Sequence, residues 1–227
     1  MHAAFTDPLN TQRDHVLLDI PMCKQDFFGD CGPSCLMMVL SYYNMIEMTF
    51  KHKIEIWRKS VLFPLRASGL FGLATVAAEH GLNVIVLKGY ERFVMSRLSE
   101  DLIYYESLGG KIDLESILPI SYEIQKKKAL SHSNVRVFYK RLEPNDITNV
   151  LSNFGVPLIV LVWRNTNFPY IHWVVVKGYS LKRKAFYINE PETGTQELVS
   201  FDDFVNMINM VSIEPGDTQA LLIVRSK

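Results

Sequence analysis

The sequence predicts an α+β protein in which an N-terminal helical part packs on a C-terminal antiparallel sheet. Two observations support this expectation. Helical patterns come first, and the clearest is CGPSCLMMVLSYY from Cys31 to Tyr43. Apolar, β-branched runs come second, and the most continuous is PLIVLVW from Pro157 to Trp163, which suits a strand buried on both faces. Helices followed by strands favour α+β over an alternating α/β arrangement.

Length and composition predict a single domain over residues 1–227. The chain contains 48% hydrophobic and 21% charged residues, which is typical of a globular protein. A chain of this length can bury a large core without disulfides or metal. The 24 basic and 24 acidic residues cancel. That balance argues against a nucleic-acid partner, because such proteins usually carry a basic excess.

The cysteine count and the N-terminus predict a cytoplasmic protein. Three cysteines, an odd number, do not make a disulfide framework, and free thiols are typical of a reducing compartment. Residues Met1 to Asn10 lack the basic-then-apolar pattern of a signal peptide. No apolar run approaches the roughly 18 residues that span a bilayer, so we expect no membrane span.

The first third of the chain contains two helical patterns and two short strand patterns. Asp30 is a candidate N-cap for the first helix, and Gly81 ends the second helix as a C-cap. In chain order, we expect a strand over His15–Pro21, a helix over Cys31–Tyr43, a helix over Ser68–His80 and a strand over Asn83–Leu87.

The middle of the chain is more polar and predicts a helical insertion at about residues 91–130. Helical patterns run from Glu91 to Tyr105 and from Asp113 to Leu130, with Gly109-Gly110 between them. We expect Pro119 to break or kink the second helix, because proline lacks the N–H that a helix interior requires.

The C-terminal part alternates strand patterns with two short helices. Gly155 stops the first of these helices, and Ser200 caps the second, with two aspartates in its first turn. In chain order, we expect a strand over Asn134–Tyr139, a helix over Pro144–Phe154, strands over Pro157–Trp163, Ile171–Tyr179 and Lys184–Asn189, a helix from Ser200 through Met210 and a strand over Thr218–Val224.

Cys31 stands at the predicted start of a helix, where free backbone N–H groups and the positive end of the helix dipole stabilise an anion. A thiol there gains thiolate character, which nucleophilic attack requires. Gly32 lets the backbone approach a substrate closely. The alternative is a semi-buried structural cysteine, which is common for an isolated thiol, and the adjacent Asp30 carboxylate disfavours the thiolate.

Gln25 lies six residues before Cys31, on a loop that we expect to turn back at Gly29. Its side-chain amide and the Cys31 backbone N–H are suitable donors to the oxyanion of a tetrahedral intermediate. Cys23 and Cys35 fit structural roles better than catalytic ones. Cys31 and Cys35 lack further ligands at metal-binding spacing, so we expect neither a metal nor a cofactor.

His172 interrupts the apolar strand pattern IHWVVVKGY, and a polar ring in such a strand needs a partner or a catalytic role. The other five of the six histidines lie near termini, charged runs or helix ends, where solvated side chains are common. His172 is therefore the candidate general base. Taken alone, a polar ring in such a strand is somewhat more often a hydrogen-bonded structural histidine than a catalytic one.

A base needs a third group to fix its tautomer. Asn189 and Glu190 end the strand after His172, and both can accept the imidazole N–H. Alternation puts them on opposite faces of the sheet, so only one can serve. We favour Glu190, with Asn189 as the alternative. The stretch NEPETG is also a good turn sequence in any protein.

These residues together resemble the bacteriocin-processing cysteine peptidases, which cleave double-glycine leaders and belong to the papain-like superfamily. Gln25, Cys31 and Gly32 match the family's first motif, and the stretch HWVVVKGYSLKRKAFYINEPETG matches its His-aromatic-Val-Val strand and hairpin. His172 follows Cys31 by 141 residues, and papain-like enzymes place the histidine about 130–150 residues after the nucleophile. Glu190 stands where the family has aspartate.

The resemblance implies a papain-like fold and a hydrolase, namely a cysteine peptidase or amidase. Cys31 would attack a peptide or amide carbonyl, Gln25 would hold the oxyanion and His172 would protonate the leaving amine. Glu190 lengthens the orienting arm by one methylene relative to aspartate. No transporter domain is attached, so the double-glycine leader is not carried over as the substrate.

Two other functions fit the same residues. A thiol acyltransferase would use the same site with an amine or thiol in place of water, and fold does not decide between the two. A non-catalytic module would keep the fold and bind a peptide in the cleft, with Lys126, Lys127 and Lys128 available to a partner. A triple lysine is more often a solvated face.

Overall fold

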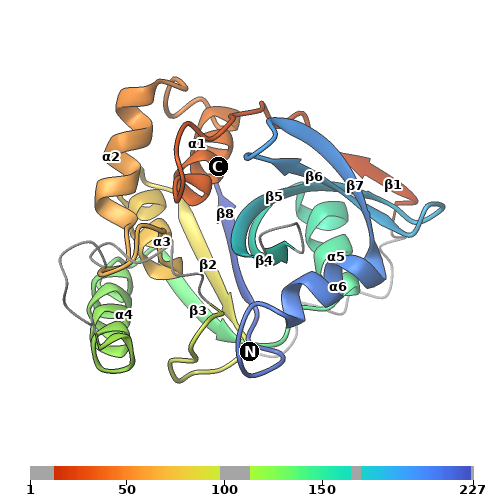
Figure 1. The fold of residues 1–227 in the computed structure, drawn as a ribbon. Helices are drawn as coiled ribbons and strands as arrows, with labels where there is room; N and C mark the ends of the chain where they lie inside the picture. The colour runs from red at the N-terminus through yellow and green to blue at the C-terminus, as the bar shows by residue number, and fades with distance from the viewer. Residues whose placement is uncertain (1–12, 98–112, 165–169, 226–227) are drawn as a thin grey trace.

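A single mixed sheet forms the centre of the computed structural model, which describes residues 13–97, 113–164 and 170–225 (Figure 1). The elements in chain order are β1 (His15–Leu17), α1 (Cys31–Tyr42), α2 (Phe50–Ser60), α3 (Leu70–Glu79), β2 (Asn83–Lys88), α4 (Leu114–Leu130), β3 (Val135–Tyr139), α5 (Pro144–Phe154), β4 (Leu158–Arg164), β5 (Tyr170–Ser180), β6 (Ala185–Glu190), β7 (Thr195–Ser200), α6 (Phe201–Asn209) and β8 (Gln219–Val224).

The sheet has the strand order β3-β2-β8-β4-β5-β6-β7, and β1 pairs with the far end of β5. Its described pairs are antiparallel except β2 with β3, which run parallel. The α+β class is confirmed, but the expected purely C-terminal, antiparallel sheet is wrong in detail. Strands from the first 140 residues complete it, because β8 returns to the centre and pairs with β2.

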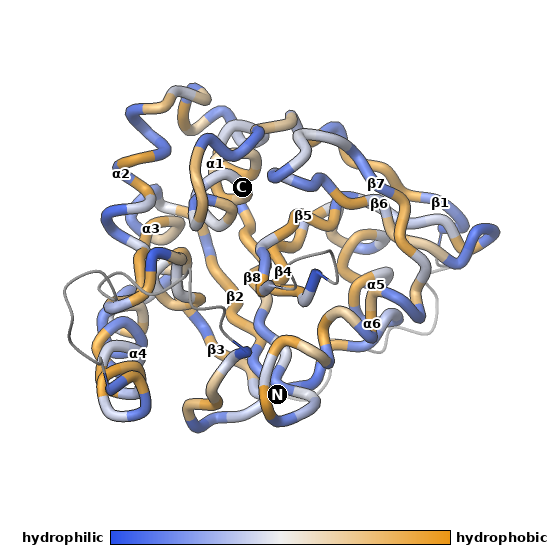
Figure 2. Tube along the Cα trace, viewed as in Figure 1, coloured by the Kyte–Doolittle hydropathy of each residue, from blue (hydrophilic) through white to orange (hydrophobic). Residues whose placement is uncertain are grey.

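Helices cover both faces of the sheet. Trp173 and Val175 point into one buried cluster, which they share with α1 and α3. Val174 and Val176 point into a second cluster, which they share with α5 and α6. This alternation is what a strand buried on both faces requires. Figure 2 shows hydrophobic residues along the central strands β2 and β8. The second helical layer, α5 and α6, was not part of the predicted arrangement.

The predicted helix ends agree closely with the structure. Gly81 follows α3 with φ +77° and Gly155 follows α5 with φ +60°, the left-handed conformation that glycine adopts without strain. The Ser200 hydroxyl accepts a hydrogen bond from the Asp203 N–H at the start of α6. Asp30 precedes α1, but its side chain makes no capping hydrogen bond. Neither α2 nor β7 is among the elements expected from the sequence.

The expected helical insertion is confirmed only in its second half. The helix α4 runs unbroken through Pro119 and packs on α3, so the predicted break at that proline is wrong. Residues 91–97 form no helix and make an isolated bridge between Ser96 and Ser212. Residues 98–112 lie outside the described residues. Lys126 and Lys128 make surface contacts with the Glu91 carbonyl and the Glu79 carboxylate.

The helices of the structure lie within the described ranges 13–97, 113–164 and 170–225. None of the helices there combines the length and the hydrophobicity needed to cross a bilayer.

The contact between α2 and α3 yields a stability prediction. A Cβ added at Gly72 would lie 2.4 Å from the backbone oxygen of Ser60. Helix propensity alone would favour alanine by about 1 kcal/mol, whereas overpacking costs about 1–3 kcal/mol and backbone cannot move aside as a side chain can. We expect Gly72→Ala to lower the free energy of unfolding in urea by about 1–2 kcal/mol. Glu55→Ala, on the exposed face of α2, should change it by less than about 0.5 kcal/mol, and a stabilised Gly72→Ala would contradict the close contact.

Candidate active site

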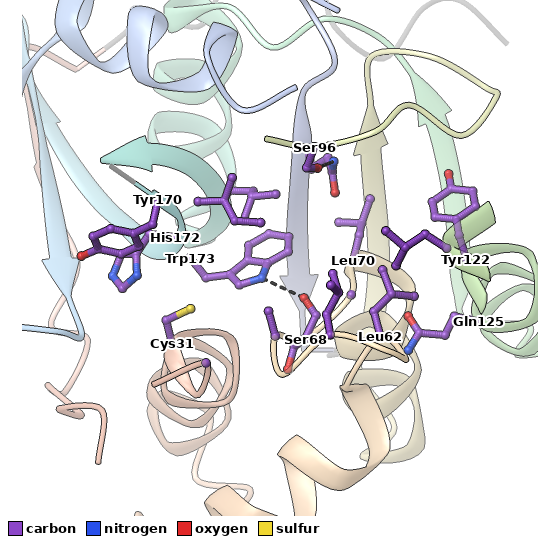
Figure 3. A pocket seen from close by; sticks show the side chains of 18 of the residues that line it. Cys31, Leu62, Ser68, Leu70, Ser96, Tyr122, Gln125, Tyr170, His172 and Trp173 are labelled. Atoms are coloured by element: carbon purple, nitrogen blue, oxygen red, sulfur yellow. Dashed lines mark hydrogen bonds between the residues drawn. The ribbon is translucent and has the colours of Figure 1, made fainter. Parts of the chain in front are cut away.

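Cys31 is the first residue of α1, as the sequence predicts, and its thiol is free. The residue is 6% exposed and lines a cleft. Its side chain interacts with the His172 ring, and Figure 3 shows the sulfur projecting from α1 toward β5. The helix start places the backbone N–H groups of the first turn beside the sulfur, which favours an anion there.

Gly32 is required by packing inside the protein. A Cβ at this position would lie 2.9 Å from the Ser68 Cβ and 3.0 Å from Cδ1 of Trp173. The Trp173 indole in turn donates a hydrogen bond to the Ser68 carbonyl, 3.1 Å away (Figure 3). From the sequence, Gly32 is expected to let a substrate approach the backbone closely. In the structure the groups that approach it are Ser68 and Trp173.

Gln25 lies on the loop before α1 and lines the same cleft as Cys31. Its backbone N–H donates to the carbonyl of Pro191, 2.8 Å away, which ties this loop to the end of β6. The loop turns back at Gly29 with φ +95°, and a Cβ there would meet the Arg66 carbonyl at 2.6 Å. The side-chain oxygen of Gln25 is buried and has no hydrogen-bond partner among the described residues.

His172 and Glu190 form a buried pair across β5 and β6. Nε2 of His172 lies 2.5 Å from Oε1 of Glu190, and the two residues are 1% and 0% exposed. The Glu192 N–H donates to the same carboxylate oxygen at 2.9 Å. Because Nε2 is occupied by Glu190, Nδ1 is the ring nitrogen that remains for the Cys31 thiol.

Electrostatics hold this pair in its charged form. Burial alone would lower the pKa of His172, but the neighbouring Cys31 thiolate and the Glu190 carboxylate outweigh it and raise the pKa to about 10. Burial alone would raise the pKa of Glu190, but the His172 imidazolium, the Glu192 N–H and the Arg164 cation lower it below its usual range. The surroundings of the pair therefore favour the charged form of both groups.

Asn189 does not reach the imidazole. Its side-chain amide donates to the Ile20 carbonyl at 3.2 Å and lies against the Met38 sulfur on the α1 face of the sheet. The register pairs Asn189 with Val175 and so turns Glu190 to the opposite face, where His172 lies. Of the two candidates for orienting the base, the structure brings Glu190 to the ring and leaves Asn189 in the core.

The other two cysteines have different surroundings. Cys35 is fully buried, its thiol donates to the Trp173 carbonyl at 3.2 Å, and burial raises its pKa well above the ordinary value. Burial also raises the pKa of Cys23. Within the described ranges, no cluster of three or more His, Cys, Asp or Glu side chains could hold a metal ion.

The cleft extends well beyond Cys31 and His172. The empty space along it is about 950 Å³, a figure that includes the open solvent at its mouth. Figure 3 shows the two residues at one end, with Tyr122 and Gln125 of α4 at the other. Its walls between the two ends are mostly apolar and include Leu62, Leu65, Leu70, Phe93, Val94 and Leu118.

Two charged residues next to the site were missed by the sequence analysis. Arg164 ends β4, and its Nε lies 3.5 Å from Oε2 of Glu190, while its other nitrogens bind the Glu197 carboxylate at 3.1 Å. Lys53 of α2 is 2% exposed and contacts the loop that carries Gln25. An arginine that ends an apolar strand is a signal that could have identified Arg164. The charged sequence around Lys53 offers no such signal.

The N-terminal part of the chain matches a known family. Residues 20–104 match the model of DUF3335, described as "Peptidase_C39 like family". The matched segment contains Gln25, Cys31 and Gly32, is less than half of the 227 residues, and ends before His172. A search of curated protein sequences found no match.

Among the solved structures that resemble this chain are a double glycine motif protease, a peptidase domain and a cysteine protease. A double glycine motif protease from an AMS/PCAT transporter, in complex with the leader peptide, is 18% identical over 93% of this chain and 95% of its own, with a TM-score of 0.49. The peptidase domain of Streptococcus ComA, a bi-functional ABC transporter involved in a quorum sensing pathway, is 13% identical over 91% of this chain and 99% of its own, with a TM-score of 0.48.

Xylellain, a cysteine protease from Xylella fastidiosa, is 12% identical over 96% of this chain and 88% of its own, with a TM-score of 0.50. At that identity the match concerns the fold. The family match over residues 20–104, which contain the first motif, confirms the resemblance to C39-like peptidases, and the match to Xylellain shows a similar fold.

Proposed function

We propose that the protein is a cysteine peptidase or amidase in which Cys31 attacks the carbonyl carbon of a peptide or amide. One observation carries the proposal. A free thiol at a helix start, a buried imidazole and a buried carboxylate lie in contact, in that order, at one end of an open cleft. A nucleophile, its base and a group that orients the base are the three parts that nucleophilic catalysis needs.

The chemistry follows from the charges. The Cys31 thiolate attacks the carbonyl carbon, and the carbonyl oxygen becomes an oxyanion held by the Gln25 side-chain amide and the Cys31 backbone N–H. The His172 imidazolium gives its proton to the leaving amine, and the C–N bond breaks. The neutral imidazole then takes a proton from water, which attacks the thioester. The acid leaves, and the thiolate and imidazolium are restored.

Glu190 fixes the ring for both proton transfers. Its hydrogen bond to Nε2 keeps Nδ1 directed at the sulfur and stabilises the imidazolium that the first step requires. The extra methylene relative to aspartate does not prevent this contact, because the Glu192 N–H also binds the carboxylate and Arg164 neutralises its second oxygen.

The cleft favours a peptide over a small amide. Its apolar walls run from the Cys31 end to α4, which is longer than the acyl group of a small substrate requires. Alternating side chains of an extended peptide would meet those walls on one side. At the Cys31 end, where a scissile bond would lie, Gln25 and His172 also line the cleft.

The charged state of His172 can be measured by NMR. We expect the titration midpoint of His172 to lie well above 6.5, because the neighbouring thiolate and carboxylate raise its pKa to about 10. Glu190→Gln removes one of these charges and should move the midpoint downward. Glu192→Gln is the matched control, since the Glu192 carboxylate binds the Tyr170 hydroxyl instead. A midpoint near 6.5 in the parent protein would contradict the buried ion pair.

Alkylation tests the reactivity of the thiol. We expect iodoacetamide to modify Cys31 well below pH 8 and far faster than Cys23 or Cys35, because burial raises the pKa of both other thiols. His172→Ala should slow the modification of Cys31 by at least about tenfold, since it removes the cation beside the sulfur. Peptide mapping by mass spectrometry locates the modified residue. Equal, slow labelling of all three cysteines would exclude a catalytic Cys31.

Product analysis tests the reaction. We expect the parent protein to cleave members of a proteome-derived peptide library to free carboxylates, as measured by mass spectrometry. Cys31→Ala and His172→Ala should each abolish cleavage, while His132→Ala, at a partly exposed histidine away from the cleft, should retain it. Products that carry glycine amide, when this amine is supplied, would establish the acyltransferase instead. Cleavage by Cys31→Ala, or none by the parent, would overturn the proposal.

A further inference from the structure

The side-chain oxygen of Gln25 is buried and accepts no hydrogen bond from the part of the chain that the structure describes. An oxyanion donor is effective only when it is aimed before the reaction begins, because reorganisation costs rate. The orientation of Gln25 must therefore come from the backbone on either side of it.

Lys53 donates hydrogen bonds to the loop on both sides of Gln25. Its Nζ donates to the carbonyl of Lys24 at 2.6 Å and to Oδ2 of Asp26 at 2.5 Å, so it contacts both residues that flank Gln25. Oδ2 of Asp30 lies 3.5 Å from the same nitrogen and accepts the Asp26 N–H at 2.8 Å. The ammonium group thus contacts the loop at three points, namely Lys24 before Gln25, Asp26 after it and Asp30 directly before Cys31.

The position of Lys53 in the fold is costly for a cation. The residue is 2% exposed and lies on the buried face of α2, in line with Ile56 and Ser60. A buried charge persists when it is paired and hydrogen-bonded, and here Asp26 and Asp30 supply the counter-charges. Burial alone would lower the pKa of Lys53, but these partners and Cys23 raise it above its ordinary value.

Lys53 also favours a thiolate at Cys31, because it offsets a neighbouring negative charge. Asp30 is fully buried directly before Cys31, and an uncompensated carboxylate there would disfavour a neighbouring anion. The sequence analysis counted Asp30 against the thiolate for this reason. Lys53 supplies a positive charge 3.5 Å from that carboxylate, in addition to the His172 imidazolium beside the sulfur.

We propose that Lys53 is a positioning residue that aims Gln25 at the oxyanion and compensates the charge of Asp30. The inference rests on the proposed function, in which Gln25 is an oxyanion donor. It predicts that two properties of the site separate. The reactivity of the thiolate depends on the charge of Lys53. Acyl transfer to Cys31 depends in addition on the hydrogen bonds that Lys53 donates to the loop around Gln25.

Two rates measured on the same protein separate these effects. Iodoacetamide alkylation of Cys31 reports on the thiolate and needs no oxyanion donor. Acylation by p-nitrophenyl acetate, followed as the burst of nitrophenolate, forms an oxyanion and needs one. Lys53→Met removes both the positive charge and the hydrogen bonds to the loop around Gln25. The double variant Lys53→Met/Asp30→Asn removes one positive and one negative charge, so it restores the net charge beside Cys31 but not the hydrogen bonds to the loop. Lys51→Met, on the exposed face of the same helix, is the matched control.

For Lys53→Met, we expect the burst rate to fall about 10- to 100-fold, the range that a misplaced catalytic donor produces. The pH profile of Cys31 alkylation should move to higher pH, with a plateau rate within about threefold of the parent. In the double variant the alkylation profile should return toward that of the parent, while the burst stays slow. Lys51→Met should match the parent in both rates.

Asp26→Asn keeps the test decisive if removal of the buried lysine unfolds the protein. Asp26 is 50% exposed, so its variant should fold, and it weakens the hydrogen bonding of Lys53 on one side of Gln25. We expect a severalfold slower burst with little change in alkylation. A burst at the parent rate in Asp26→Asn and in every folded Lys53 variant would overturn the inference.

If the double variant recovers both the burst rate and the alkylation profile of the parent, Lys53 acts through its charge alone. That result would also overturn the positioning role. Failure of the proposed function is a different result, because the parent protein would then show neither selective Cys31 alkylation nor a burst.

Discussion

The pairing of β5 with β6 is the constraint on which the site depends. Its register sets Asn189 opposite Val175, which turns Glu190 onto the face of His172 and closes a buried contact of 2.5 Å. A shift of one residue would exchange Glu190 for Asn189 and bury a carboxylate in the apolar core beside α1. The same strands are anchored on both faces by buried side chains, so the register is strongly determined by packing as well as by hydrogen bonds.

Around this contact the protein places several charges in its interior, and each is compensated by a neighbour. His172 lies between Cys31 and Glu190, Arg164 neutralises the outer oxygen of Glu190, and Lys53 binds the loop that leads to Cys31. Unpaired, any of these charges would be costly at such burial. Together they favour the charged form of the His172 ring, which an ordinary hydrophobic core would leave neutral. The helices α1 and α2 therefore serve the site as well as the core.

Much of this arrangement could be predicted from local sequence signals. The start of α1 at Cys31 and the strand around His172 depend on hydrophobic periodicity and turn residues, which act over a few positions. What could not be predicted depends on distant packing. Lys53 reads as a surface residue in FKHKIEIWRKS, because its acidic partners lie more than 20 residues away. The edge strand β7 has no buried residue and shows no alternation. The β2–β8 pairing joins Asn83–Lys88 with Gln219–Val224, which are far apart in the sequence. Gly32 was assigned to a substrate because nothing in the sequence shows that Ser68 and Trp173 pack against it.

The most direct test of the account is a crystal structure of the protein with a peptide aldehyde. The account predicts a covalent bond between the Cys31 sulfur and the aldehyde carbon. The resulting oxygen should lie within about 3 Å of the Gln25 side-chain nitrogen and of the Cys31 backbone N–H, and His172 should keep its contact with Glu190. An aldehyde that binds the cleft without a bond to Cys31, or an oxygen directed away from Gln25, would contradict the assignment of this cleft as a thiol-based catalytic site.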